Sequence, residues 1–310
     1  MTTQPLILEP LEDASNIDDV VRNLDLVVDW SIRAKSTIGY FAVLYGRGTV
    51  AVQEAAKQGK FRDAQWVEQL DVCFAKRYFD ALNAFFHPDR YDREALTLPW
   101  EVAFLAQHNG HATMLQHMIA SLNAHICYDL GIAVVDLSAN RLEEIKPDFE
   151  GINDIVATQT ESMLAIVQRR SPAVRWIRWA IPGETKFIRT ILGRFREGAW
   201  HFAIGMALNP EAMHAKRVNQ VAWTAGLGAW YLEPPQTWSP APLLVRGIAR
   251  SENTDVAGNI RALRASPANP TARRGIRQGL SRIGAALRAV RSRGRRPART
   301  HRPDQPGAAA

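Results

Sequence analysis

Apolar residues recur every three or four positions from about residue 15 to residue 232, and this periodicity restricts the fold more than any other feature of the sequence. An α-helix turns about 100° per residue, so this spacing places the apolar side chains on one side of each helix. The best candidate for a short strand, 132–137, is better interpreted as the end of a helix. The pattern predicts an all-α fold, a single compact bundle-like domain in which helices bury their apolar faces against one another.

Turn residues divide this part of the chain into successive helices. Ser15 is expected to cap the first helix, with Asp18 three residues later. Pairs that contain proline, glycine or asparagine mark the later breaks. We expect the following helices at 38–58, 62–87, 98–107, 112–133, 149–169, 172–181, 184–207 and 209–231.

The helix expected at 112–133 carries two polar residues where apolar residues would be usual. His125 and Asp129 are four positions apart, so they lie on the same face of a helix. A buried carboxylate needs a hydrogen-bond donor, a cation or a metal, or it stays protonated. We consider three interpretations of this pair: a structural hydrogen bond that fixes helix packing, a metal site, and a metal-free acid/base site.

The helix expected at 62–87 offers partners for that pair. Asp71 and Tyr78 lie in its apolar stripe, and Arg77 lies at the edge of the stripe. If the two helices pack face to face, these three residues could share one polar pocket with His125 and Asp129, as in many helical bundles. The simpler alternative is that Asp71 only pairs with Arg77.

A divalent metal such as zinc, iron or manganese is the cofactor considered for this pocket, with His125, Asp129 and Asp71 as its ligands. The chain has no H-E-x-x-H motif, and Cys73 and Cys127 do not form a C-x-x-C pair. The ligands would therefore have to come from more than one helix.

The helix expected at 184–207 could line the same pocket. His201 flanks its apolar stripe and is expected to be a boundary residue, not a ligand. Arg194, Arg196 and Glu197 fall on other faces, where we expect solvated charges.

The composition changes after residue 232. Residues 236–310 contain fifteen arginines, no lysine and three acidic residues, which is a net charge of +12. Because the whole chain carries +7, the remainder carries −5. We therefore expect an N-terminal extension at 1–15, a helical domain at 16–232, a Pro-rich linker at 233–272 and an Arg-rich, largely disordered tail at 273–310.

A short amphipathic helix is expected within the tail. Its apolar stripe alternates with arginines and consists of Ile276, Leu280, Ile283, Leu287 and Val290. Such a helix can make non-specific contact with an anionic membrane or with nucleic-acid phosphates. The alternative is a solvated extension without a partner.

Several motifs between Ile17 and Tyr231 resemble an uncharacterised family of bacterial helical proteins, a domain of unknown function. They are Gly39-Tyr-Phe41, Leu44-Tyr45, Leu70-Asp71, Arg77-Tyr78, Trp100, Asn123-x-His-Ile-x-x-Asp-Leu-Gly-Ile-Ala133, Asp148-Phe149, Ile152-Asn153 and Ala199-Trp200. The resemblance implies a compact all-α domain and no particular reaction. Relatives often have asparagine in place of Cys127 and arginine in place of His201, so neither of these two positions is expected to be an essential ligand.

Two functional classes fit these observations. In the first, a metal-assisted or acid/base enzyme uses His125 as ligand or base and Asp129 and Asp71 as ligands or orienting groups, while Arg77 and Tyr78 hold an anionic or carbonyl small molecule. In the second, a non-catalytic binding or scaffold protein contains a structural His-Asp pair, and its basic tail contacts an anionic surface. The enzyme predicts convergence on a solvent-accessible cavity with a perturbed titration. The scaffold predicts a closed network in which every polar atom is paired.

The cytoplasm is the expected location. The first nineteen residues are acidic and contain no basic residue, unlike a signal peptide. No uninterrupted apolar run approaches the roughly 18 residues of a membrane span. The two separated cysteines suit a reducing compartment.

Overall fold

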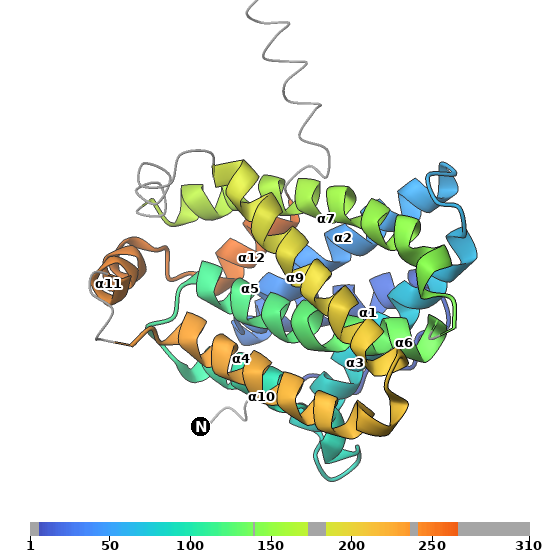
Figure 1. Cartoon of the computed structure of the whole chain (residues 1–310). Coiled ribbons are helices and arrows are strands. Elements are labelled where there is room, and N and C mark those ends of the chain that lie inside the picture. The colour runs from blue at the N-terminus through green and yellow to red at the C-terminus, as the bar shows by residue number, and fades with distance from the viewer. Residues whose placement is uncertain (1–5, 139, 173–183, 236–240, 266–310) are drawn as a thin grey trace, which may run out of the picture. The chain divides into compact units, whose positions relative to one another are not determined.

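The computed structural model describes residues 6–138, 140–172, 184–235 and 241–265, and within these ranges every regular element is a helix (Figure 1). The all-α prediction is therefore confirmed. The α-helices are α1 (Ile17–Ala34), α2 (Ile38–Lys57), α3 (Ala64–Phe86), α4 (Leu98–Leu105), α5 (Met114–Leu122), α6 (Gly131–Ser138), α7 (Leu142–Arg170), α9 (Glu184–Ala207), α10 (Met213–Leu232), α11 (Ala241–Ser251) and α12 (Val256–Arg264). Short helical turns lie at η1 (Arg93–Ala95), η2 (Ala106–His108) and η4 (Pro210–Ala212), and η3 (Asn123–Leu130) is a π-helix.

One continuous helical run, α5–η3–α6, forms the centre of the fold (Figure 1). Helices α2, α3, α4, α9 and α10 all pack against parts of it. The run is long and apolar enough to span a membrane by length and composition, contrary to the sequence-based expectation, and 89% of its most apolar window is buried inside the protein. Its apolar side chains are thus used in the core of the fold.

Local hydrogen bonds explain where several helices begin. Asn16, not Ser15, caps α1, because its side chain accepts a hydrogen bond from the backbone of Asp19 at 2.9 Å. Thr113 and Gln116 form a reciprocal capping box at the start of α5. Helix α7 begins at Leu142, seven residues earlier than expected, with Pro147 inside the helix. The helix expected at 172–181 lies almost entirely outside the described residues.

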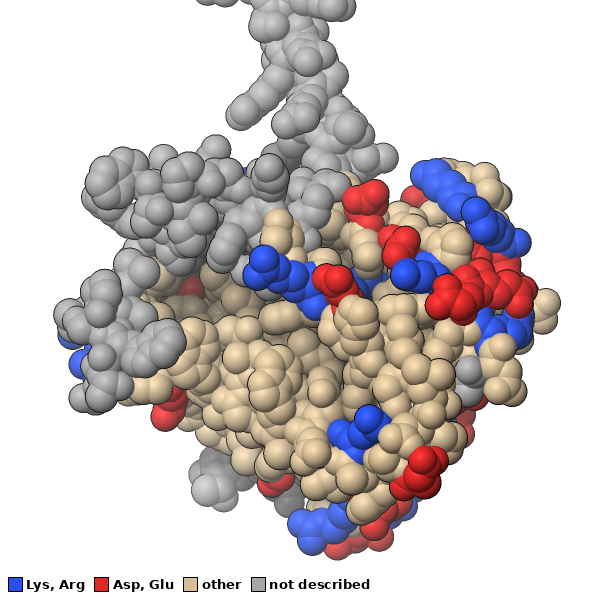
Figure 2. All heavy atoms as spheres, in the orientation of Figure 1, with Lys and Arg blue, Asp and Glu red and all other residues tan. Residues whose placement is uncertain are grey.

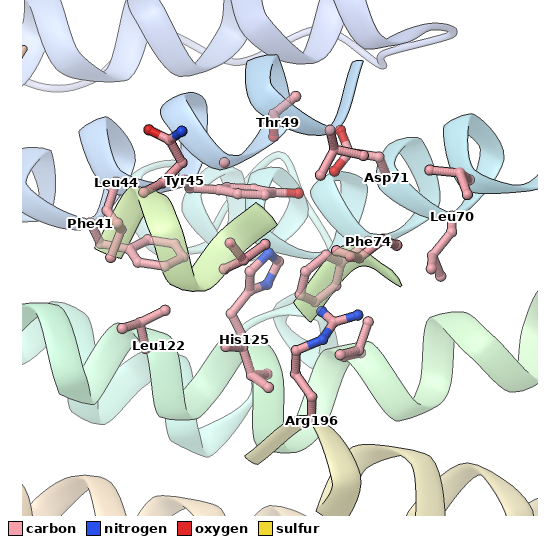
Figure 3. Close-up of a pocket in the computed structure, with 18 residues that line it drawn as sticks. Phe41, Leu44, Tyr45, Thr49, Leu70, Asp71, Phe74, Leu122, His125 and Arg196 are labelled. Atoms are coloured by element: carbon pink, nitrogen blue, oxygen red, sulfur yellow. The ribbon is translucent and has the colours of Figure 1, made fainter. Parts of the chain in front are cut away.

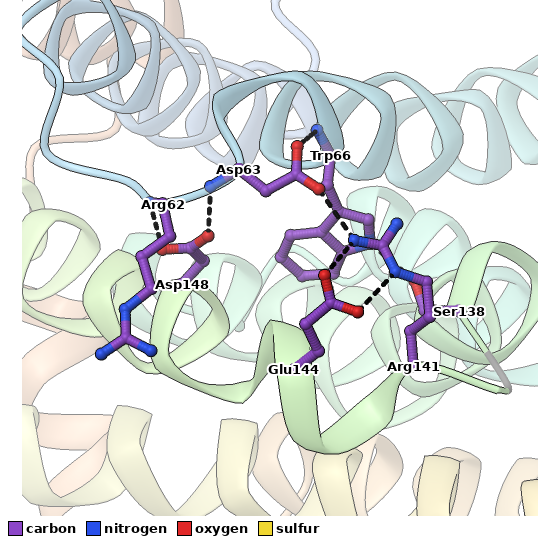
Figure 4. A network of polar contacts seen from close by, with 7 residues as sticks. All are labelled: Arg62, Asp63, Trp66, Ser138, Arg141, Glu144 and Asp148. Carbon is purple, nitrogen blue, oxygen red and sulfur yellow. Dashed lines mark hydrogen bonds and ion pairs between the residues drawn. The ribbon is translucent and has the colours of Figure 1, made fainter.

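A polar network ties the start of α3 to α7 (Figure 4). The carboxylate of Asp148 accepts hydrogen bonds from the backbone nitrogens of Arg62 and Asp63, both at 2.8 Å. The Trp66 indole donates to the hydroxyl of Ser138 at 2.6 Å. These bonds fix the position of α3, and therefore of the residues that α3 contributes to the candidate site.

Helices α11 and α12 lie in the segment that the sequence predicts to be a linker. Ile260 and Leu263 of α12 are fully buried, and α12 packs against α1, α2 and α7. A Cβ added at Gly39 would lie 2.6 Å from the Cβ of Ser31 in α1 and 2.7 Å from the side chain of Ile260, so Gly39 lets α2 pack closely against both α1 and α12. The short apolar pattern of α12 is difficult to recognise in this proline- and arginine-rich segment. Its apolar residues are used in the contact with the rest of the domain. The predicted tail at 273–310 lies outside the described residues.

The part of the surface over α10 carries few charged side chains (Figure 2). Most Lys, Arg, Asp and Glu side chains in that view gather at its edges. Trp223 and Trp230 of α10 are among the exposed large apolar residues, at 57% and 36%.

Candidate functional site

The π-helix η3 holds the two residues singled out by the sequence. All eight of its residues are buried. His125 Nδ1 lies 3.3 Å from Asp129 Oδ2, so the predicted proximity of this pair is confirmed. The expected α-helical geometry is wrong here, because a π-helix pairs residues five apart instead of four. Such segments occur often at functional sites.

Two side-chain hydrogen bonds tie this π-helix to α10. The change of hydrogen-bond register leaves backbone groups that need other partners. Gln220 donates to the backbone oxygen of Cys127 at 2.7 Å, and Asn123 donates to the backbone oxygen of Thr224 at 2.7 Å. At the end of the segment, a Cβ added at Gly131 would lie 2.8 Å from a backbone oxygen of α9. The neighbouring helices therefore constrain the π-helix on two sides.

Asp129 has three polar neighbours. Trp100 donates its indole N–H to Oδ2 at 2.7 Å, and Arg77 donates from Nε to Oδ1 at 3.0 Å. His125 is the third neighbour. Arg77 thus pairs with Asp129, and the alternative in which Arg77 pairs with Asp71 is wrong. Asp129 is 1% exposed, so these groups supply the partners that a buried carboxylate needs.

His125 is buried in an aromatic cage with its second nitrogen free. Its ring stacks on Phe74 with centroids 3.5 Å apart, and it meets the ring of Tyr45 edge-on at 4.6 Å. Burial lowers the pKa of His125, and the nearby Asp129 opposes that shift. A neutral imidazole that donates from Nδ1 to the carboxylate leaves a lone pair on Nε2. Nε2 is buried and has no hydrogen-bond partner.

This free nitrogen faces a cavity of about 70 Å³ (Figure 3). The cavity is lined mostly by aliphatic and aromatic side chains. Two polar atoms of its lining residues, Tyr45 Oη and His125 Nε2, are buried without a partner, whereas the Thr49 hydroxyl lies close enough to the Asp71 carboxyl to lower its pKa by hydrogen bonding. An unsatisfied buried polar group costs about 1–3 kcal/mol, so two around one cavity call for an explanation.

Asp71 is the acidic group of the cavity. Burial raises the pKa of its carboxyl to about 7, the Thr49 hydroxyl opposes this shift, and Glu68 adds to it. Near neutral pH both the protonated and the ionised form of Asp71 are therefore populated. Burial also raises the pKa of Tyr45, and the charges of Asp71 and Asp129 raise it further, so the phenol stays protonated.

Three predicted site residues, Tyr78, Arg77 and Asp129, lie beside the cavity without lining it. The Tyr78 ring packs on Trp100 with centroids 4.8 Å apart, and its buried hydroxyl has no partner. Arg77 is occupied by Asp129. Neither is among the residues that line the cavity, and nor is Asp129. The structure therefore brings His125 and Asp71 to one cavity and places Asp129, Arg77 and Tyr78 around His125.

Sequence reasoning missed Tyr45, Thr49 and Arg196. Arg196 was expected to be solvated, yet it is only 4% exposed and lines the cavity. The spacing contained the signal, because Arg196 follows the buried Leu192 by four positions and precedes the buried Trp200 by four. Burial lowers the pKa of Arg196 to about 10, so it remains a cation at neutral pH. His201, in contrast, is exposed.

The proposed metal ligands do not assemble in the part of the chain that the structure describes. No group of three or more His, Cys, Asp or Glu residues in that part is placed to hold a metal ion. Asp129 already accepts from Trp100 and Arg77, and it does not line the cavity that Asp71 and His125 share.

The fold and cavity define an all-α protein with a buried polar site beside a π-helix. Residues 17–234 match the sequence profile of a family of unknown function, DUF5995, and the chain belongs to this family. No curated protein and no solved structure matches the chain.

Proposed function

We propose that the cavity is an acid/base site for a small polar molecule, with His125 as the base and Asp71 as the second proton carrier. The observation that carries this proposal is that His125 Nε2 and Tyr45 Oη are buried without partners around one cavity that Asp71 also lines. A scaffold with a purely structural His-Asp pair would leave these atoms paired with one another. A bound molecule would supply the missing hydrogen bonds.

The contacts give each residue a role. His125 Nε2 accepts a proton from the bound molecule, and the imidazolium that forms is stabilised by Asp129. Asp129 is a positioning residue, because Trp100 and Arg77 hold its carboxylate in place. Asp71 accepts or releases a proton near pH 7. Tyr45 and Thr49 offer hydroxyl groups to the molecule.

The cavity volume limits the size of that molecule. About 70 Å³ is roughly half of a cavity of about 150 Å³ that binds benzene. The site therefore suits a compound of up to about four non-hydrogen atoms, or a few water molecules. A metal-assisted version of the site would have to use His125 and Asp71 without Asp129.

The test combines ring-nitrogen NMR of His125 with a screen of small polar fragments on the full chain. We expect the spectrum to show a proton on Nδ1 and none on Nε2, and at least one fragment to shift the His125 signals. His125→Gln and Asp71→Asn should each weaken binding of that fragment at least tenfold, whereas His201→Gln, which changes an exposed histidine, should leave it unchanged.

Two results would contradict the proposal. If no fragment shifts the His125 signals and ordered waters satisfy His125 Nε2 and Tyr45 Oη in a crystal structure, the scaffold interpretation holds. If plasma mass spectrometry finds near-stoichiometric zinc, iron or manganese that is lost in a folded His125→Ala variant, the metal-assisted interpretation holds.

A further inference from the structure

Arg196 is a buried cation that has no acidic partner among the described residues. Its side chain lies over the ring of Phe149, with the guanidinium carbon 4.5 Å from the ring centroid. Nη2 donates to the backbone oxygen of Phe149 at 3.1 Å, and Nε donates to Asn153. The structure gives no hydrogen bond for Nη1 and no carboxylate paired with the guanidinium. Two neutral acceptors thus hold the group in a fixed orientation.

Burial of such a cation is unfavourable without an opposite charge. Isolated charges are rarely buried, because the loss of hydration costs several kcal/mol. Asp71 is the other charged group that lines this cavity. Figure 3 shows Arg196 on one side of His125 and Phe74, with Thr49 and Asp71 on the other side. The end of the cavity at Arg196 therefore lacks a negative charge.

We infer that Arg196 binds the carboxylate of a short monocarboxylic acid, which places the other end of that molecule toward His125. A guanidinium has a planar fork of N–H groups that matches the two oxygens of a carboxylate. The aliphatic and aromatic lining suits the apolar part of such an acid. The small volume admits molecules the size of formate or acetate. This inference names the class of ligand that the proposed site binds and rests on that proposal. It concerns binding alone, because formate and acetate carry no proton at their other end that His125 could accept.

The experiment compares each carboxylate with a neutral amide of the same shape. Formate, acetate, formamide and acetamide are titrated into the full chain, and binding is followed by the His125 ring signals. We expect each carboxylate to bind at least tenfold more tightly than its amide. Arg196→Met should abolish this preference. Arg194→Met changes an exposed arginine on the same helix and should leave it intact.

The outcomes separate this inference from the proposed function. Amides that bind as well as carboxylates, or a preference for carboxylates that survives in Arg196→Met, would overturn the inference and leave the acid/base site standing. Silence of the His125 signals toward all fragments would overturn both. If circular dichroism shows that Arg196→Met is unfolded, the test uses the wild type and Arg196→Lys instead. Loss of at least half of the preference for carboxylates over amides in Arg196→Lys supports binding by the guanidinium fork. Full retention of that preference overturns it.

Discussion

Trp100 donates its indole N–H to the same carboxylate oxygen of Asp129 that lies beside His125. The Trp100 bond is 2.7 Å long, and the distance from His125 to that oxygen is 3.3 Å. Trp100 is 1% exposed, so this hydrogen bond is shielded from solvent. The orientation of His125 therefore depends on a tryptophan from a different helix.

Trp100→Phe should destabilise the protein and loosen His125. The substitution removes a donor to a buried carboxylate, which costs about 1–3 kcal/mol, and leaves a gap beside the ring of Tyr78. Urea unfolding measures the loss of stability. Trp223→Phe, at an exposed position, should change the free energy of unfolding by less than about 0.5 kcal/mol. Equal effects of the two substitutions would show that the Trp100 bond contributes nothing.

Asp71→Asn should remove a component of the pH dependence of stability. The pKa of Asp71 is about 7 in the folded protein and near 4 in the unfolded chain, so the folded protein binds the proton more tightly. This group therefore stabilises the fold at low pH, and that stabilisation is lost as the pH rises through 7. Between pH 5.5 and 8, the free energy of unfolding of the wild type should fall by about 2 kcal/mol more than that of Asp71→Asn. The free energy of unfolding of both proteins is measured with urea at each pH. If it changes with pH by the same amount in the two proteins, the prediction is wrong.

His117 should contribute a pH dependence of the opposite sign. It is 5% exposed, and burial lowers its pKa to about 4, below the value of about 6.5 in an unfolded chain. The stabilisation from a neutral His117 is present above pH 6.5 and is lost as the pH falls toward 4. When the pH falls from 7 to 5, the free energy of unfolding of the wild type should fall by about 2 kcal/mol more than that of His117→Gln. The measurement is chemical unfolding at both pH values, with His214→Gln as an exposed control.

A chain cut after residue 234 should be much less stable than one cut after residue 265. The shorter chain matches the family profile but lacks Ile260 and Leu263, and the burial of each contributes about 1.5–3 kcal/mol. Arg264 also pairs with Asp25 and Asp29, at 2.9 and 2.6 Å. Thermal unfolding of both truncated chains tests this prediction.

A point substitution tests the same contact in the full chain. Ile260→Ala should lower the free energy of unfolding by about 2–5 kcal/mol, and Arg261→Ala, at an exposed site, should lower it much less. A short chain as stable as the long one would mean that α12 adds nothing to the fold.

The sequence predicted the parts of the fold and site that depend on local spacing. The helices of the central region follow from the apolar period, and the contact between His125 and Asp129 follows from their spacing of four residues. The bond from Arg77 to Asp129 could also be predicted from the sequence, because both residues lie on or near apolar stripes that face each other.

Other parts depend on contacts between distant segments. Tyr45 and Thr49 lie on α2, where every residue from Ile38 to Tyr45 is buried, so no pattern distinguishes a cavity residue from a core residue. The spacing of His125 and Asp129 is the same on an α-helix and on a π-helix, so it could not reveal the π-helix. Helix α12 was hidden because its composition resembles that of the arginine-rich segment that follows.

The π-helix means that the site depends on the length of the chain as well as on its residues. Each bond in this segment spans five residues, so it accommodates one residue more than an α-helix would. Loss of a single codon between positions 123 and 130 would let the run return to α-helical pairing. The residues of α6 would keep about the same orientation toward α3 and α9, because the wider turn already absorbs the extra residue. His125 and Asp129, which lie inside the segment, would change their positions around the helix, so a deletion of one residue here would alter the site and leave the fold in place.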